Sequence, residues 1–262
     1  MANLRLKITG EPRNITVRGF VSAIENWMKV LDDLDSAISH EPQGSLDWFV
    51  VDLSMGSLAV EIESRSKVED KNVAPEVADA FLTGIQQVER AEASPPYLSD
   101  LGMQRMRQLV RLVGREGTAG FAVTHLDRTV EVSARASANI DQFIRVQQHS
   151  IGSVEGRLET ISVHGRKPRF IVYHGLTRKA ITCKFEGREW LERAKDALGQ
   201  RVNVLGEVHY NIKAEPLRVE PEELRILREK DELPTTADIG GSDRDFTRGL
   251  STEEYLRRIR GG

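Results

Sequence analysis

Basic and aromatic side chains gather between residues 149 and 228, in a pattern that suits contact with a single-stranded nucleic acid. This segment carries 15 basic and 11 acidic residues, whereas the whole chain has a formal net charge of −3. Proteins hold single strands in a basic groove along the phosphates, with aromatic rings on which the bases stack. Outward-facing Glu155, Glu159 and Glu207 interrupt the basic set. The candidate nucleic-acid-binding residues are Arg157, Arg166, Lys167, Arg169, Tyr173, Arg178, Lys179, Lys184, Tyr210 and Lys213.

The last twelve residues have a pattern that suits a protein partner instead. Ser251 and Glu254 form a capping box, which predicts the start of a helix. A helix this short is marginal alone, so we expect it to fold on a surface, either of this protein or of a partner. Its apolar face and its arginines are the candidate partner-binding residues: Tyr255, Leu256, Arg257, Arg258, Ile259 and Arg260.

The remaining polar groups do not predict a catalytic or metal site. His164, His174 and His209 lack the short spacings of metal ligands, and we expect no acidic ligand near them and no bound metal. Three carboxylates near the middle of the first helix, Asp32, Asp33 and Asp35, point in different directions on a helix, and we expect a solvated face. The chain has no phosphate-binding loop, dinucleotide fingerprint or nucleophile elbow. We therefore expect a protein without cofactor or catalytic activity.

Strands and helices that would position these residues alternate along the first half of the chain. Alternating apolar residues predict strands, and apolar residues three or four positions apart predict helices. Residues 54–56 predict a tight turn between two strands, and Leu126-Asp127 a second turn. The order is that of an α+β domain with hairpins and long helices. The expected strands are 3–9, 47–53, 57–64 and a hairpin at 119–132, and the expected helices are 17–39, 74–93, 98–114 and 134–146.

The second half predicts a small barrel of five strands with one helix. Its first strand, residues 152–164, contains Gly156 and a shift of register near Thr160, which together predict the bend that a small barrel needs. The expected strands are 152–164, 168–174, 179–185, 201–210 and 216–227, with a helix at 187–198.

Three strands, a helix and two strands follow one another as in OB-fold domains, which this segment resembles. The resemblance rests on Val154-Glu-Gly-Arg-Leu158 and on Val202-Asn-Val-Leu-Gly-Glu-Val208, which is similar to a common fourth OB strand. It covers about 80 residues and implies a topology rather than one function. The whole chain also resembles uncharacterised bacterial proteins. The tail resembles the C-terminal arms of bacterial antitoxins, which fold onto a ribonuclease toxin and place an arginine in its acidic site.

The composition favours a cytoplasmic protein. Cys183 is the only cysteine, which excludes a disulfide framework, and its neighbours place it on the apolar face of a strand. No apolar run approaches the ~20 residues that span a bilayer, so we expect no membrane contact. The first residues run directly into a strand pattern, and we expect no secretory signal.

The predicted organisation is therefore an α+β domain of unknown role (1–148), an OB-like barrel (149–228), a flexible linker (229–250) and an amphipathic helix (251–262). Our first hypothesis is a non-enzymatic binding or adaptor protein that acts in a complex through barrel and tail, with a toxin or defence effector as a possible partner. The alternative is a single-strand nucleic-acid-binding accessory protein, whose affinity would fall with salt. The third hypothesis is an enzyme whose site lies in the N-terminal domain.

Overall fold

The computed structural model describes residues 2–10, 14–41, 43–54, 58–68, 72–115, 117–163, 167–229, 232–233, 247 and 249–260. The chain divides into two compact units, Met1–Leu227 and Arg228–Gly262, which we describe separately. The predicted α+β class is confirmed, because the first unit combines helices with two five-stranded sheets. Among the described residues, no helix has both the length and the apolar character needed to cross a bilayer.

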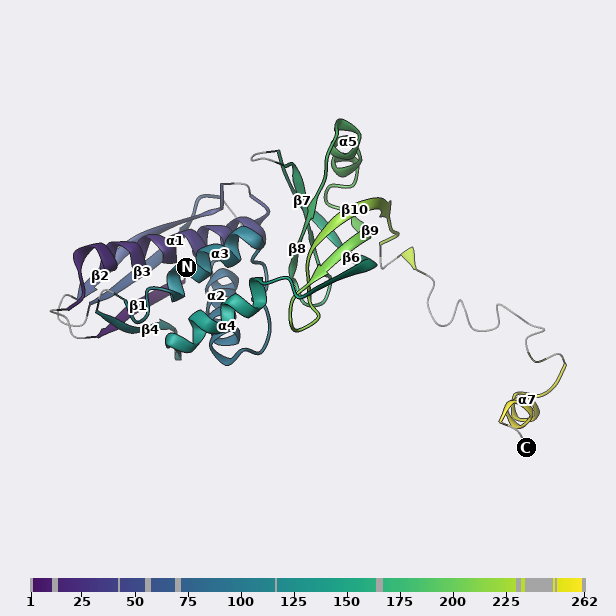
Figure 1. Cartoon of the computed structure of the whole chain (residues 1–262), viewed down its shortest axis with the longest axis horizontal. Coiled ribbons are helices and arrows are strands. Elements are labelled where there is room, and N and C mark those ends of the chain that lie inside the picture. The colour runs from purple at the N-terminus through teal and green to yellow at the C-terminus, as the bar shows by residue number, and fades with distance from the viewer. Residues whose placement is uncertain are drawn as a thin grey trace. The chain divides into compact units, whose positions relative to one another are not determined.

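The first sheet is antiparallel and is covered by helices on one face (Figure 1). Its elements are β1 (Asn3–Gly10), α1 (Val17–Ser39), β2 (Leu46–Ser54), β3 (Ala59–Ser66), α2 (Ala74–Arg90), α3 (Asp100–Val110), β4 (Thr118–His125), β5 (Arg128–Val132) and α4 (Ala134–Ile144). The strand order is β2-β3-β1-β4-β5. Burial alternates along β1, where Leu4, Leu6 and Ile8 are buried and Arg5 and Lys7 are exposed. The buried side chains form one core with the apolar stripes of the four helices.

Helices α4 and α5 (Arg188–Asp196) end two residues earlier than predicted, and α2 and α3 end three and four residues earlier. Ala91 has a left-handed backbone (φ 54°) and ends α2, since Glu92 N–H closes a wide turn onto the Gln87 carbonyl. After Val110 the α-helix gives way to tighter turns, because the amides of Leu112 and Val113 donate to carbonyl oxygens three residues earlier in the chain rather than four. The α-helix α3 therefore stops before Gly114. Of the predicted turn at 54–56, Met55 and Gly56 lie outside the described residues.

The second sheet closes on itself into a barrel. Its elements are β6 (Gln148–Ser162), β7 (Arg169–Tyr173), β8 (Ala180–Lys184), α5 (Arg188–Asp196), β9 (Arg201–Tyr210) and β10 (Pro216–Ile226). The strand order is β10-β8-β7-β6-β9, and β9 also pairs with β10, which completes the ring. Among the described residues of the barrel, β8 and β10 are the only strands that pair in parallel. The domain boundaries at 148 and 228 remain predictions, and β6 begins at Gln148.

The bend predicted in the first barrel strand is confirmed. The pairing of β6 with β7 shifts register between Leu158 and Thr160, so Glu159 is the extra residue of a β-bulge. Gly156 lies where the backbones approach closely, since a Cβ there would come within 2.3 Å of the Tyr173 carbonyl oxygen. The glycine allows the tight approach, and the bulge turns the Glu159 side chain toward Arg178.

Cys183 lies in the core of the barrel, as predicted, and should be chemically inert in the folded protein. Burial raises the pKa of its thiol, so almost no thiolate forms near neutral pH. We expect a thiol-reactive dye to label the denatured chain at once and the native chain only at the rate of unfolding. Rapid labelling of the native chain, followed by absorbance, would contradict this burial.

The second unit contains the helix predicted at the C-terminus. Helix α7 (Thr252–Ile259) has Ser251 as its N-cap, and the Ser251 hydroxyl and the Glu254 carboxylate form the reciprocal bonds of a capping box. Most of the predicted linker, residues 230–231, 234–246 and 248, lies outside the described residues.

Candidate functional site

The outer face of β7 and β8 is covered by the N-terminal part of the same unit. Ile171 and Tyr173, which point out of the barrel, form a small apolar cluster with Ala37 of α1. Tyr97 and Ala180 pack against this cluster. Tyr173 is only 3% exposed, and burial raises the pKa of its phenol. Tyr173 was predicted as a stacking platform for bases, and this prediction is wrong, because the ring is already packed inside the protein.

Arg178 holds this covered face together rather than facing solvent. Its guanidinium donates to both oxygens of Glu159, at 3.1 Å each. It also lies over the rings of Tyr97 and Tyr173, 5.3 and 5.5 Å from their centroids. The Glu159 side chain is 5% exposed, and His40, the residue that ends α1, lies 3.4 Å away. Arg178 is thus the main counter-ion of a buried carboxylate.

Lys179 lies in a second polar junction of the same kind. Its ammonium pairs with Glu215, which also accepts bonds from Ser94 and Asn211. Burial would raise the pKa of Glu215, but these hydrogen bonds outweigh it and hold the pKa below its ordinary value. The segment between α2 and α3 is therefore tied to the barrel by a charged network that occupies Lys179.

The other predicted basic residues do not form a continuous basic surface. Lys167 pairs with Glu186 on the surface. Arg169 and Lys184 line a pocket of about 210 Å³ together with Asp100, at the start of α3. Burial raises the pKa of Asp100, although Lys184, Arg218 and Arg169 oppose it. Arg157 and Lys213 are exposed, Tyr210 packs partly against the barrel core, and Arg166 lies outside the described residues.

Two of the three helical carboxylates, Asp33 and Asp35, have structural roles, which corrects the expectation of a solvated face for them, whereas Asp32 is exposed. Asp35 is 2% exposed and accepts from the Ser45 amide and hydroxyl and from the Leu46 amide, at 2.7 to 2.9 Å. It therefore fixes the start of β2. Asp33 pairs with Arg105 of α3, and burial raises its pKa to about 6 despite this partner.

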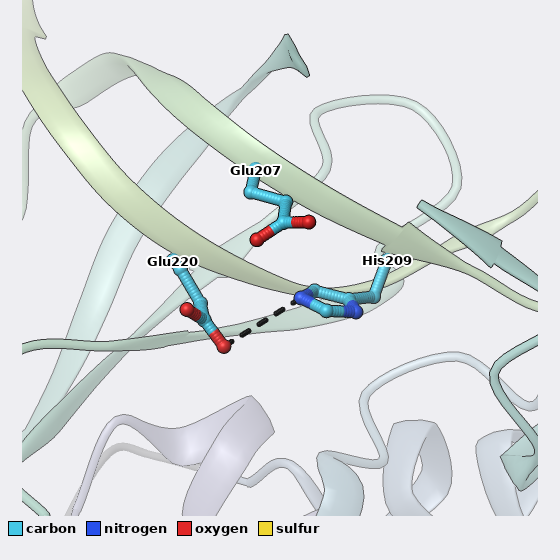
Figure 2. Close-up of side chains that lie close together, drawn as sticks. All are labelled: Glu207, His209 and Glu220. Atoms are coloured by element: carbon cyan, nitrogen blue, oxygen red, sulfur yellow. Dashed lines mark ion pairs between the residues drawn. The ribbon is translucent and has the colours of Figure 1, made fainter. Parts of the chain in front are cut away.

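The structure brings two acidic side chains to His209, which corrects the expectation of no acidic ligand near this histidine. Glu207 and His209 alternate on the outer face of β9, and Glu220 of β10 is paired in register with Glu207 (Figure 2). One ligand atom from each of the three residues lies within 4.8 Å of the others. His149 of β6 is paired with His209 and bonds to Glu207. Of the other two histidines named from the sequence, His174 bonds to Thr177, and His164 lies outside the described residues.

A spacing in the sequence could have revealed half of this cluster. Glu207 and His209 are two residues apart in a predicted strand, which places both on one face. Glu220 and His149 come from neighbouring strands, and their positions depend on a register that the sequence does not give. The pairing of β9 with β10 is shifted by irregularities on both sides of Glu220.

The candidate residues of the tail lie on one short exposed helix or, for Arg260, directly after it. Within Thr252–Ile259, which is described in full, no residue is buried. Leu256 and Ile259 are 42% and 62% exposed. Arg257 and Arg258 lie in the last turn, where positive charge favours the helix dipole, and Arg260 follows directly. The helix therefore presents apolar and basic side chains that its own unit does not cover.

Comparison with known proteins adds no assignment. No protein-family model matches the chain, and no curated protein is a significant match. The function must therefore be argued from the geometry of the described residues.

Proposed function

We propose that this chain is a non-enzymatic binding protein that acts in a complex, with helix α7 as its partner-binding arm. The observation that carries the proposal is the exposed apolar face of a helix with a complete capping box. The cap specifies where the helix begins, and such a short helix gains most of its stability from packing. A sequence that encodes the cap and leaves Leu256 and Ile259 uncovered is suited to folding against another protein.

The chemistry of α7 favours a partner with an apolar groove bordered by carboxylates. Leu256 and Ile259 would enter the groove, as in other helix-in-groove complexes. Arg257, Arg258 and Arg260 would form charge-assisted bonds with the carboxylates. A toxin or defence effector with an acidic active site fits this description, in keeping with the resemblance of the tail to antitoxin arms.

The barrel would serve in this proposal as a scaffold of the OB type. The closed order of its strands, the helix between β8 and β9 and the parallel pairing of β8 with β10 support that assignment. OB domains bind oligonucleotides on the face of their second and third strands, which here are β7 and β8. Because Ile171 and Tyr173 are covered on that face, the single-strand nucleic-acid alternative has less support than the protein partner.

Replacing the two apolar anchors tests the proposal. We expect Leu256→Ser/Ile259→Ser in the full-length chain to weaken capture of the partner by at least about 10-fold, because truncating a buried interface anchor commonly costs 1 kcal/mol or more. The measurement is the amount of co-purifying protein per mole of tagged chain, identified by mass spectrometry.

A matched control is Glu253→Gln, which alters the same helix but leaves the apolar face intact. The proposal predicts capture by the control at the level of the unaltered chain. Equal capture by the double variant and the control would show that α7 does not contact the partner through this face.

A further inference from the structure

We propose that Glu207, His209 and Glu220 bind one divalent transition-metal ion, with Zn²⁺ as the probe that fits their chemistry, and that His149 positions Glu207. An imidazole nitrogen and two carboxylates are a ligand set that zinc takes in proteins, with a fourth position left for water. The ligands come from β9 and β10, and His149 comes from β6. The proposal involves no residue of α7 and does not depend on the proposed partner arm.

The spacing of the ligand atoms is close to that of an occupied site. His209 Nε2 and a Glu220 oxygen are 3.6 Å apart. Two ligands of a tetrahedral zinc, at bond lengths of 2.0–2.1 Å, are separated by about 3.3 Å. The third ligand atom, from Glu207, lies within 4.8 Å of both. Because the Glu220 side chain is 64% exposed, it can move the short distance that is needed without repacking the core.

His209 itself supplies an independent indication. Its side chain is only 12% exposed, and its Nε2 atom is buried with no hydrogen-bond partner among the described residues. A buried polar atom without a partner is costly, and such atoms are rare unless an ion or water satisfies them. This nitrogen points toward the Glu220 carboxylate (Figure 2). A metal ion between them would satisfy both groups.

Arg218 of β10 is paired in register with His209. Arg218 adds a positive charge beside the site, which the two carboxylates offset.

His149 has the geometry of a positioning residue. Its Nδ1 bonds to a Glu207 oxygen, and its ring stacks on that of His209 with centroids 5.7 Å apart. Groups that orient metal ligands in this way commonly change metal affinity by 10- to 100-fold when removed. His149 would thus hold the Glu207 carboxylate in position without itself coordinating the metal.

The experiment is calorimetric titration of Zn²⁺ into the tag-free, chelator-treated, full-length chain. We expect one ion per chain and a rise in Tm with added zinc. His209→Ala should weaken zinc binding by at least about 100-fold, and Glu220→Gln should weaken it by at least about 10-fold. His149→Ala should lower the zinc affinity by about 10- to 100-fold. His174→Ala, a barrel histidine that bonds to Thr177 instead, is the control and should bind like the unaltered chain.

A cooperative thermal transition without metal will show that each variant is folded. We expect this for His209→Ala, because the substitution removes a buried atom that has no partner. As a second readout, Co²⁺ bound at the site should give the intense visible absorption of a four-coordinate ion, and Glu220→Gln should reduce it. The absence of stoichiometric zinc binding, or equal binding by His209→Ala and the unaltered chain, would overturn the proposal.

Discussion

Replacing Arg178 with alanine should lower the free energy of unfolding by about 3 kcal/mol, because the substitution leaves a buried carboxylate without its main counter-ion. Glu159 is 5% exposed and receives both of its strong bonds from Arg178. Removing one partner of such a pair costs more than the pair itself contributes, since the remaining charge stays buried. The variant also removes the cation that lies over Tyr97 and Tyr173. Urea unfolding followed by circular dichroism measures the loss.

Arg225→Ala is the matched control. Arg225 makes the same two-bond contact, to Glu223, but on the surface of the barrel. Exposed ion pairs contribute little because water and salt screen them. We therefore expect a much smaller loss of unfolding free energy for this variant than for Arg178→Ala. Equal effects of the two substitutions would mean that the Glu159 site is as well hydrated as the surface.

Gly156→Ala should destabilise the barrel by about 3 kcal/mol, near the upper end of the range for a forced steric clash. The added Cβ would lie 2.3 Å from the Tyr173 carbonyl oxygen and 2.7 Å from the Val172 side chain. Both atoms belong to β7, which is paired with β6, so relief requires the two strands to separate. The midpoint of thermal unfolding should fall accordingly.

Gly175→Ala provides the comparison, because a Cβ at Gly175 would meet nothing within 4 Å. Such a substitution in an open turn is neutral or slightly stabilising, through the lower entropy of the unfolded chain. A Gly156→Ala variant as stable as Gly175→Ala would contradict the close approach of β6 and β7.

Local patterns in the sequence were enough to predict the main elements. The helix expected at 17–39 has those bounds in the structure, because its apolar stripe is long and Thr16 caps its start. The bend of the first barrel strand was predicted from Gly156 and the shift near Thr160, and both features act as expected. These signals are local, so one sequence contains them in full.

The covering of side chains by distant elements could not be predicted in the same way. Alternation assigns Tyr173 to the outer face of its strand, but it does not say that α1 and Tyr97 cover that face. Asp35 was expected on a solvated helix face, because Asp32, Asp33 and Asp35 point in different directions on a helix. It is instead buried, and it accepts hydrogen bonds from three donors of Ser45 and Leu46. The cluster around His209 depends on the registers of three strands, which the irregular pairing of β10 makes impossible to infer from spacing.

Partner binding through α7 is tested most directly by comparing the full-length chain with a version that ends at Leu227, each purified from cells with a tag at moderate salt. Mass spectrometry would identify bound protein, and the ratio of absorbances at the nucleic-acid and protein maxima would report bound nucleic acid. We expect a stoichiometric protein partner with the full-length chain and none with the shorter one. Nucleic acid retained equally by both versions and released by salt, with no protein partner lost on truncation, would contradict this expectation and assign binding to the barrel.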